Sequence, residues 1–212
     1  MAVRIKFCGL TRAEDVVEAE ALGADYIGVI FAGGPRLRTM NQAAELIGFV
    51  ERATTVGVFG AATPDEIMRY VSAVPVSVAQ LHHRATPASV AAVRGAGARE
   101  VWAVVPVIAG ELPDGAAQLF LTADAVVLDT GAANGLGGTG RSFDWGGIAE
   151  RLAEVKRTAK LVVAGGLNDE NVRDAIRLLN PDVVDVSSGV ESSPGVKDSK
   201  LMRRFSEAAR SA

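Results

Sequence analysis

The sequence predicts one α/β domain over residues 1–212, a (β/α)8 TIM barrel of eight parallel strands with outer helices. Short apolar, β-branched runs alternate with amphipathic helical segments along the whole chain. Eight such pairs fit into 212 residues, about the shortest length that closes such a barrel. A doubly wound open sheet is the alternative for alternating strands and helices. It rarely needs eight units, and no G-x-G-x-x-G pattern follows the first strand.

The predicted strands are short and apolar. The second is rich in Ile and Val, as expected of a parallel strand that helices cover on both faces. In chain order we expect strands at Val3–Cys8, Ala24–Phe31, Thr54–Phe59, Pro75–Leu81, Glu100–Val105, Ala125–Asp129, Lys160–Ala164 and Asp182–Val186.

The predicted helices follow these strands and carry start and stop signals. Two begin with a threonine N-cap followed by proline, at Thr63 and Thr86. Glycines end the first helix, at Gly23, and the helix that begins at Thr86, at Gly97. Asp144 is expected to cap a helix, with an aromatic residue packing behind it. In chain order we expect helices at Arg12–Leu22, Asn41–Arg52, Thr63–Ala73, Thr86–Ala96, Pro113–Leu121, Asp144–Arg157, Asp169–Leu179 and Ser199–Ala209.

Composition excludes several classes of protein. The net charge of −3 argues against a nucleic-acid binder, which usually has a basic face. No apolar run is long enough to span a membrane, and the first residues enter a strand pattern rather than a signal peptide. One cysteine and two histidines make an internal disulfide impossible and a dedicated zinc site unexpected. We therefore expect a cytoplasmic protein that binds neither metal nor membrane.

Small residues follow three neighbouring strands at the end where barrel enzymes carry their sites. Backbone N–H groups in such turns bind anions, and loops after the last two strands recurrently bind phosphate in this fold. The alternative is that these glycines only make tight turns, but three such loops meeting at neighbouring strand ends favour a phosphate site. The predicted phosphate-binding residues are Gly137, Gly138, Gly165, Gly166, Ser187, Ser188 and Gly189.

Two titratable residues end non-adjacent strands, Cys8 the first and Asp129 the sixth. A barrel interior is narrow, so their side chains can reach one ligand from two sides. A thiolate can take a proton and a carboxylic acid can give one, which indicates a general base and a general acid. Cys8 could equally be a small buried apolar residue, and Asp129 a helix cap or a loop charge.

Three further residues are candidates for binding substrate. Arg36, in a Gly-Gly-Pro-Arg loop, is a permanently charged clamp for a carboxylate or phosphate, or else a solvated surface residue. His82 ends the fourth strand as a ligand contact or a histidine hydrogen-bonded in place. Asp185, in the eighth strand, either orients a substrate hydroxyl or holds loop N–H groups.

These residues lie in segments that resemble phosphoribosylanthranilate isomerases of tryptophan biosynthesis. The resemblance spans the chain in order. It includes Lys6-Phe7-Cys8-Gly9-Leu10-Thr11-Arg12, Gly33-Gly34-Pro35-Arg36, Gly57-Val58-Phe59, Gln80-Leu81-His82, Leu128-Asp129, Gly137-Gly138-Thr139-Gly140-Arg141-Ser142-Phe143-Asp144-Trp145, Ala164-Gly165-Gly166-Leu167, Asn171-Val172 and Asp185-Val186-Ser187-Ser188-Gly189-Val190-Glu191 through Gly195-Val196-Lys197-Asp198.

The resemblance implies an Amadori rearrangement of N-(5-phosphoribosyl)anthranilate to 1-(2-carboxyphenylamino)-1-deoxyribulose 5-phosphate without a metal or organic cofactor. It implies that Asp129 protonates the ribose ring oxygen, that Cys8 takes the proton from sugar C2, and that Arg36 holds the anthranilate carboxylate. The glycine and serine loops match the family's phosphate cradle. Members of this family are monomers or homodimers, and we expect one of these states here.

The chain departs from the family pattern in its loops, at Gly34, Gly60 and His83. A related sugar-phosphate isomerase of histidine synthesis is the alternative enzyme. That enzyme, or a bifunctional one, would be expected to use two aspartates where this chain has Cys8 and Asp129. The non-enzymatic alternative is a catalytically inactive barrel that binds a phosphorylated ligand as a sensor or partner subunit.

Overall fold

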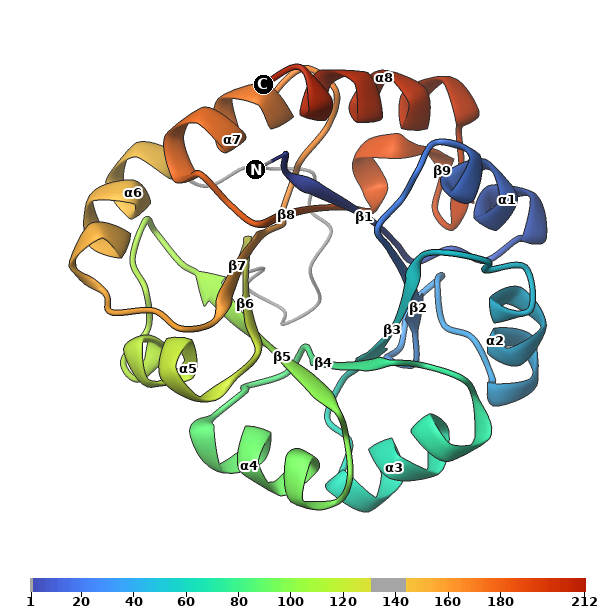
Figure 1. Cartoon of the computed structure of the whole chain (residues 1–212), viewed down its shortest axis with the longest axis horizontal. Coiled ribbons are helices and arrows are strands. Elements are labelled where there is room, and N and C mark those ends of the chain that lie inside the picture. Colours follow the sequence, from blue (N-terminus) through green and yellow to red (C-terminus); the bar gives the residue numbers. More distant parts are fainter. Residues whose placement is uncertain (1, 131–143) are drawn as a thin grey trace.

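A computed structural model of the chain describes residues 2–130 and 144–212. Its eight parallel strands pair in chain order, and the last closes onto the first, so the predicted TIM barrel is confirmed (Figure 1). Lys6 of the first strand is in register with Asp185 of the last. The barrel strands are β1 Arg4–Cys8, β2 Tyr26–Ile30, β3 Thr54–Phe59, β4 Val78–Leu81, β5 Glu100–Val107, β6 Ala125–Thr130, β7 Lys160–Val163 and β8 Val183–Val186.

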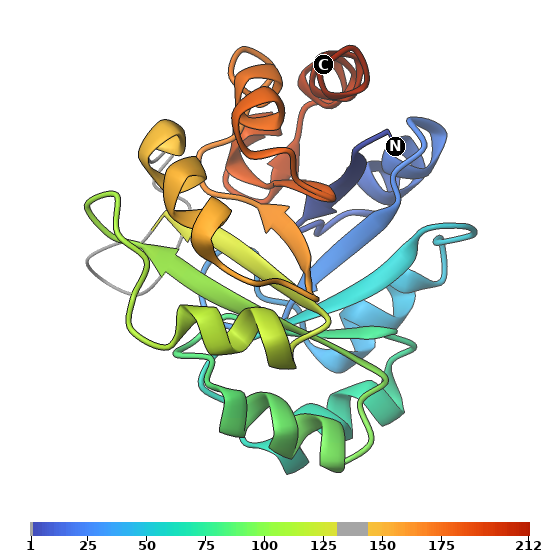
Figure 2. The same cartoon turned by 60° about the vertical axis from the view of Figure 1, so that its left-hand side comes forward.

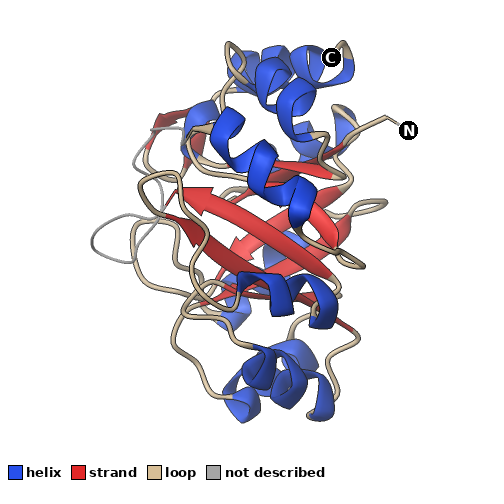
Figure 3. Ribbon diagram, turned by 90° about the vertical axis from the view of Figure 1, so that its left-hand side faces the viewer, coloured by secondary structure: helices blue, strands red, loops and turns tan. Residues whose placement is uncertain are grey.

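The helices form a ring outside the strands (Figures 1 and 2). In side view the tilted strands lie between helices above and below them (Figure 3). None of the described helices has the length and apolar character needed to cross a membrane. The helices are α1 Ala13–Ala21, α2 Met40–Ile47, α3 Pro64–Ala73, α4 Pro87–Gly95, α5 Ala116–Thr122, α6 Trp145–Glu154, α7 Val172–Leu179 and α8 Ser199–Arg210.

Alternation along each strand divides the buried side chains into two cores. In β1, Ile5 and Phe7 face the helices, whereas Cys8 belongs to a cluster inside the barrel. Trp102 is fully buried in that interior. Its ring centroid lies 4.9 Å from the ring centroid of Tyr26, in an edge-to-face contact. Because side chains pack the interior, a ligand would have to bind at the ends of the strands rather than within the barrel.

The predicted caps are confirmed, but some helices are shorter than expected. Thr63 and Thr86 each form a capping box, and the side chain of Asp144 accepts hydrogen bonds from two backbone N–H groups of α6. Helix α2 ends at Ile47 rather than Arg52. Beyond it, the buried Glu20 carboxylate accepts the backbone N–H groups of residues 51–53, which holds this stretch as a turn.

One hairpin was not predicted. After β8, a 3-10 turn at Ser188–Val190 leads into β9, Glu191–Ser193, which pairs antiparallel with β10, Val196–Lys197. The two strands are too short to show a period-2 pattern in the sequence. This hairpin carries Glu191 and Lys197 to the end of the barrel where the strands terminate.

Candidate active site

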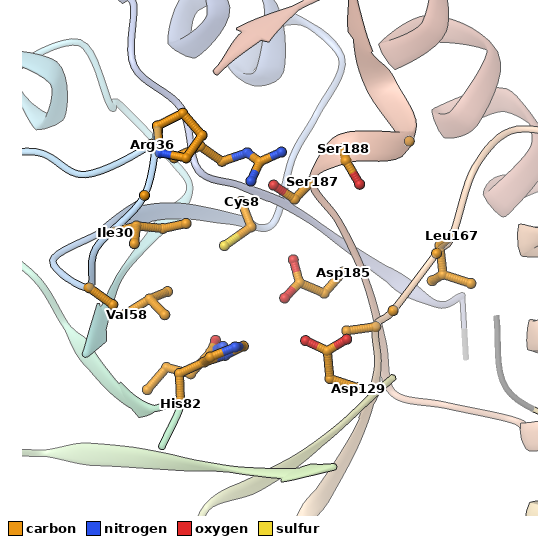
Figure 4. A pocket seen from close by; sticks show the side chains of 18 of the residues that line it. Cys8, Ile30, Arg36, Val58, His82, Asp129, Leu167, Asp185, Ser187 and Ser188 are labelled. Atoms are coloured by element: carbon orange, nitrogen blue, oxygen red, sulfur yellow. The ribbon is translucent and has the colours of Figure 1, made fainter. Parts of the chain in front are cut away.

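A cavity of about 180 Å³ opens among the loops that follow the strands (Figure 4). Side chains and loops from seven of the eight barrel units line it. The polar and glycine residues around it are Cys8, Gly33, Gly34, Arg36, Gln80, His82, Asp129, Gly165, Gly166, Asp185, Ser187, Ser188 and Gly189. The structure therefore brings every sequence-predicted site residue that it describes to one place. Gly137 and Gly138 lie outside the described residues.

Cys8 ends β1 with its sulfur inside the barrel. The side chain is buried and lines the cavity. Burial raises the pKa of the Cys8 thiol, the Lys6 ammonium opposes that effect, and the Asp185 carboxylate adds to it. Sγ lies over Gly28 of the neighbouring strand, where a Cβ atom would come within 2.8 Å of the sulfur. The Cys8 thiol is therefore largely removed from water, and the neighbouring charges of Lys6 and Asp185 influence whether it is ionised.

Asp129 lies near the end of β6, across the cavity from Cys8 (Figure 4). Removal from water raises the pKa of its carboxyl group, with His82 acting against this and Asp185 reinforcing it. A carboxyl group whose pKa is raised holds its proton to higher pH, as a general acid requires. Gly165, which follows β7 in a left-handed conformation, leaves space for the Asp129 side chain. A Cβ atom at this position would lie 2.8 Å from Asp129 Oδ1.

A buried ion pair forms the floor of the site between Cys8 and Asp129. Lys6 precedes Cys8 by two residues, so both side chains enter the barrel, and its Nζ donates to Asp185 Oδ2 at 2.7 Å. Although burial favours the neutral amine, Asp185 and Cys8 hold the pKa of Lys6 above its ordinary value. The pair fixes one oxygen of Asp185 and leaves the other free to face a ligand.

Four residues of the cavity wall present buried polar atoms that have no hydrogen-bond partner within residues 2–130 and 144–212. These atoms are Gln80 Oε1, His82 Nδ1, Asp185 Oδ1 and Ser187 Oγ. Buried polar atoms are ordinarily paired, so an unpaired group of them at one cavity indicates a polar ligand or water bound there. A sugar with several hydroxyl groups suits a mixed set of donors and acceptors.

Arg36 extends from the loop after β2 toward the end of β8 (Figure 4). Its Nε and Nη2 donate to the two carboxylate oxygens of Glu191 at 2.8 and 2.7 Å. Glu191 in turn accepts from the Lys197 ammonium at 2.9 Å. Although burial favours the neutral acid, Arg36 and Lys197 hold the pKa of Glu191 below its ordinary value.

The loops after β7 and β8 meet at one side of the cavity, where the predicted phosphate residues lie together. Gly165 and Gly166 follow β7, and Ser187, Ser188 and Gly189 follow β8. A small anion in this corner would face turn backbone rather than side chains, as in phosphate nests.

The sequence assigned no role to four residues at this site, although each lies in a segment that resembles the family: Lys6, Gln80, Glu191 and Lys197. A lysine two positions before an inward cysteine is a signal for Lys6, because period-2 alternation places both inside the barrel. Gln80 precedes the predicted His82 by the same spacing. Glu191 and Lys197 give no such signal, because only the folded hairpin brings them back to the strand ends.

Comparisons with known proteins show the family to which this chain is related. The family described as N-(5'-phosphoribosyl)anthranilate isomerase matches residues 5–208. A curated isomerase of that name from Pseudomonas fluorescens is 40% identical over 211 residues, which cover 99% of each chain. Among solved structures, a dimeric phosphoribosylanthranilate isomerase from Thermotoga maritima, studied as monomers, is 32% identical. Its TM-score is 0.84, with 99% of this chain and 100% of that chain covered.

A second solved structure is a phosphoribosylanthranilate isomerase in complex with reduced 1-(o-carboxyphenylamino)-1-deoxyribulose 5-phosphate. It is 30% identical with a TM-score of 0.85 and covers 99% of this chain and 100% of that chain. The match runs through the whole barrel and includes every strand end described above. The chain belongs to the N-(5'-phosphoribosyl)anthranilate isomerase family.

Proposed function

We propose that Cys8 and Asp129 are the general base and general acid with which this chain isomerises its family's substrate. The chain converts N-(5-phosphoribosyl)anthranilate to 1-(2-carboxyphenylamino)-1-deoxyribulose 5-phosphate in tryptophan biosynthesis. The observation that carries the two roles is their placement. The Cys8 thiol and the Asp129 carboxyl group face one cavity from non-adjacent strands, and burial raises the pKa of the Asp129 carboxyl group.

Asp129 serves the ring-opening step. The anthranilate nitrogen on ribose C1 pushes its lone pair toward C1 as the bond from C1 to the ring oxygen breaks. That oxygen leaves readily only if it receives a proton, which the Asp129 carboxyl group donates. The products of this step are an open sugar with a cationic C1=N group and an Asp129 carboxylate.

Cys8 serves the second step. The cationic C1=N group acidifies the proton on C2, and the Cys8 thiolate removes it. The electron pair of that C–H bond forms a C1=C2 bond and neutralises the nitrogen. The resulting enol becomes a ketone as C1 takes up a proton and the C2 hydroxyl group gives one up. C2 is oxidised and C1 is reduced within one molecule, so the proposed reaction uses no metal or organic cofactor.

The remaining predicted residues bind the substrate. Gly165, Gly166, Ser187, Ser188 and Gly189 hold the phosphate. Gly137 and Gly138, which lie outside the described residues, are assigned to the same role from the sequence alone. Arg36 binds the anthranilate carboxylate through its charged fork. The free oxygen of Asp185 and the Nδ1 of His82 face the ribose hydroxyl groups.

The test is a fluorescence assay with freshly prepared phosphoribosylanthranilate, following loss of the anthranilate-type signal. We expect turnover by the wild-type protein and losses of ~10²-fold or more in kcat for Cys8→Ala and Asp129→Asn, the scale of general acid–base groups. Asp65→Asn, an exposed aspartate at the start of α3, is the matched control and should retain activity. No turnover by folded wild-type protein would contradict the assignment and favour the histidine-pathway substrate or ligand binding without catalysis.

The location and assembly of the protein are part of what we propose. The protein acts in the cytoplasm on a small phosphorylated substrate, without a nucleic-acid or membrane partner, as a monomer or a homodimer. Sedimentation of the purified chain distinguishes the two states.

A further inference from the structure

Lys197 lies at the end of β10, and its charged side chain is fully buried. Its Nζ donates three hydrogen bonds, to the backbone carbonyl of Cys8 at 2.7 Å, to the backbone carbonyl of Ser187 at 3.0 Å and to Glu191 Oε1 at 2.9 Å. An ammonium group has three N–H donors, so all of them are used. One side chain thus joins the strand end that carries the base, the loop proposed to hold phosphate and the partner of Arg36.

Glu191 transmits this anchoring to Arg36. Its carboxylate receives both Nε and Nη2 of the guanidinium, and both side chains are largely buried, at 4% exposed for Glu191 and 17% for Arg36. A two-point contact of this kind fixes the plane of the guanidinium and its rotation as well as its position. The contact leaves the outer edge of the guanidinium, formed by Nη1 and Nη2, available to bind a second carboxylate.

The backbone at the end of β1 is shaped to let Arg36 reach this place. Gly9 has a left-handed φ of 70°, and a Cβ atom there would lie 2.5 Å from Arg36 Cδ and 3.2 Å from Ser187 Oγ. The stem of Arg36 therefore crosses directly over Gly9. The hairpin itself is held from outside the barrel, where the backbone N–H of Lys197 donates to Asp15 and its carbonyl accepts from Arg12.

The charges in this row alternate as Lys197, Glu191 and Arg36. Two cations around one carboxylate leave a net positive charge beside the cavity, where the proposed substrate carries a phosphate and a carboxylate. Burial lowers the pKa of Lys197, and Glu191 opposes that effect. Because taking an ion pair out of water is expensive, a buried row of charges is weak evidence for a purely stabilising role.

We propose that Glu191 and Lys197 are positioning residues that hold Arg36 with its outer edge toward the carboxylate of the substrate's aromatic ring. The inference rests on the proposed function, in which Arg36 binds that carboxylate. A purely structural role for the row predicts something different. Loosening the loop after β8 would weaken the binding of every ligand of the cavity alike. Misplacing Arg36 would weaken the binding of only those ligands that carry the carboxylate.

The experiment compares two probes by calorimetry. One is reduced 1-(o-carboxyphenylamino)-1-deoxyribulose 5-phosphate, and the other is its phenylamino counterpart without the ring carboxylate. We expect wild-type protein to prefer the first probe by roughly tenfold or more, the value of a charge-assisted hydrogen-bond pair. Arg36→Met should abolish the preference, and Glu191→Gln, which keeps the shape of the side chain, should remove most of it. Lys197→Met should reduce the preference as well.

A double variant tests the path through Arg36. Once Arg36→Met is present, Glu191→Gln should change the ratio of the two dissociation constants no further. Glu20→Gln is the matched control, because Glu20 is also a buried glutamate beside an arginine, Arg52, but does not line the cavity. That variant should keep the wild-type ratio.

Three results would overturn the inference. Equal weakening of both probes in folded Glu191→Gln protein, or failure of both Glu191→Gln and Glu191→Met to fold, would assign the row a structural role. No preference in wild-type protein would remove the carboxylate clamp and this inference with it. The turnover assay reports on the isomerase function separately, because it does not depend on the ratio of the two probes.

Discussion

The Cys8 thiol lies under opposing influences, and Lys6 is the largest that favours its thiolate. Replacing Lys6 with methionine keeps an unbranched side chain, one atom shorter, and removes the positive charge. We expect the pKa of Cys8 to rise further, so that alkylation by iodoacetamide requires a higher pH than in wild-type protein. Cys8 is the single cysteine of the chain, so the reaction reports on this site alone.

The other charges that face Cys8 set the control for that measurement. Asp185 acts against the thiolate and Lys197 favours it. Arg36 lies on the opposite side of the thiol from Asp129 and His82 (Figure 4). Lys160, paired with Glu100 at 3.0 Å, lies at the other end of the barrel, and Lys160→Met should leave the alkylation profile unchanged. An unchanged profile in Lys6→Met protein would refute the electrostatic effect.

Burial of the Asp129 carboxyl group makes the stability of the folded protein depend on pH. Its pKa is higher in the folded protein than in the unfolded chain, so folding is favoured while the group is protonated and loses that advantage as pH rises through the folded pKa. Asp129→Asn does not titrate. Urea unfolding should therefore show the variant gaining stability relative to wild type between pH 4 and pH 8. A difference that does not vary with pH would contradict the raised pKa.

Whether the sequence predicts a residue of the site depends on where that residue lies relative to the strand ends. Cys8, His82 and Asp129 were predicted because strand ends mark the active face of a barrel. Lys197 and Glu191 were not, since they reach that face through a hairpin whose strands are too short to leave a pattern. Contacts between distant segments are set by the fold and cannot be counted along the chain.

The turn after β7 fits closely against the end of β6, which carries Asp129. Gly165→Ala puts a Cβ against Asp129 Oδ1 and the Thr130 backbone at a left-handed φ of 76°. We expect a loss of about 1–3 kcal/mol in the free energy of unfolding, the usual scale for such strain, and a lower kcat as Asp129 shifts. Urea unfolding and the turnover assay measure the two effects.

Gly95, the last residue of α4, is the matched control for that turn. A Cβ there meets nothing within 4 Å, and the residue is helical. Gly95→Ala should stabilise the protein by about 0.4–1 kcal/mol, because alanine restricts the unfolded chain. If Gly165→Ala were as well tolerated as Gly95→Ala, the close fit around Asp129 would be wrong.

Element order was predictable because each unit carries its own local signals, but element ends were not. Threonine caps and glycine stops mark positions that the backbone itself requires. Helix α7 begins at Val172 rather than Asp169, since the Asn168 side chain accepts the N–H groups of Glu170 and Asn171 and forms a turn there. Such side-chain turns compete with the first helical turn, and the hydrophobic period does not record them.

On the scale of the whole molecule, closure joins the first strand to the last helix. Phe7 of β1 packs against Phe205 of α8, with ring centroids 6.2 Å apart, and both side chains are fully buried. The Arg210 side chain at the end of α8 also donates to the backbone carbonyl of Gly23 at 3.0 Å. The strand that carries Cys8 is therefore supported by the far end of the chain.

Phe205→Ala tests whether the barrel is one cooperative domain. Removing a buried phenylalanine costs about 3–5 kcal/mol, so the urea midpoint should fall substantially. If residues 1–212 form a single domain, tryptophan fluorescence, circular dichroism and isomerase activity should be lost at the same urea concentration. Leu178→Ala, at a side chain that is half exposed on α7, is the control and should change stability little. Separate transitions for activity and secondary structure would instead show that α8 and β1 unfold apart from the rest of the barrel.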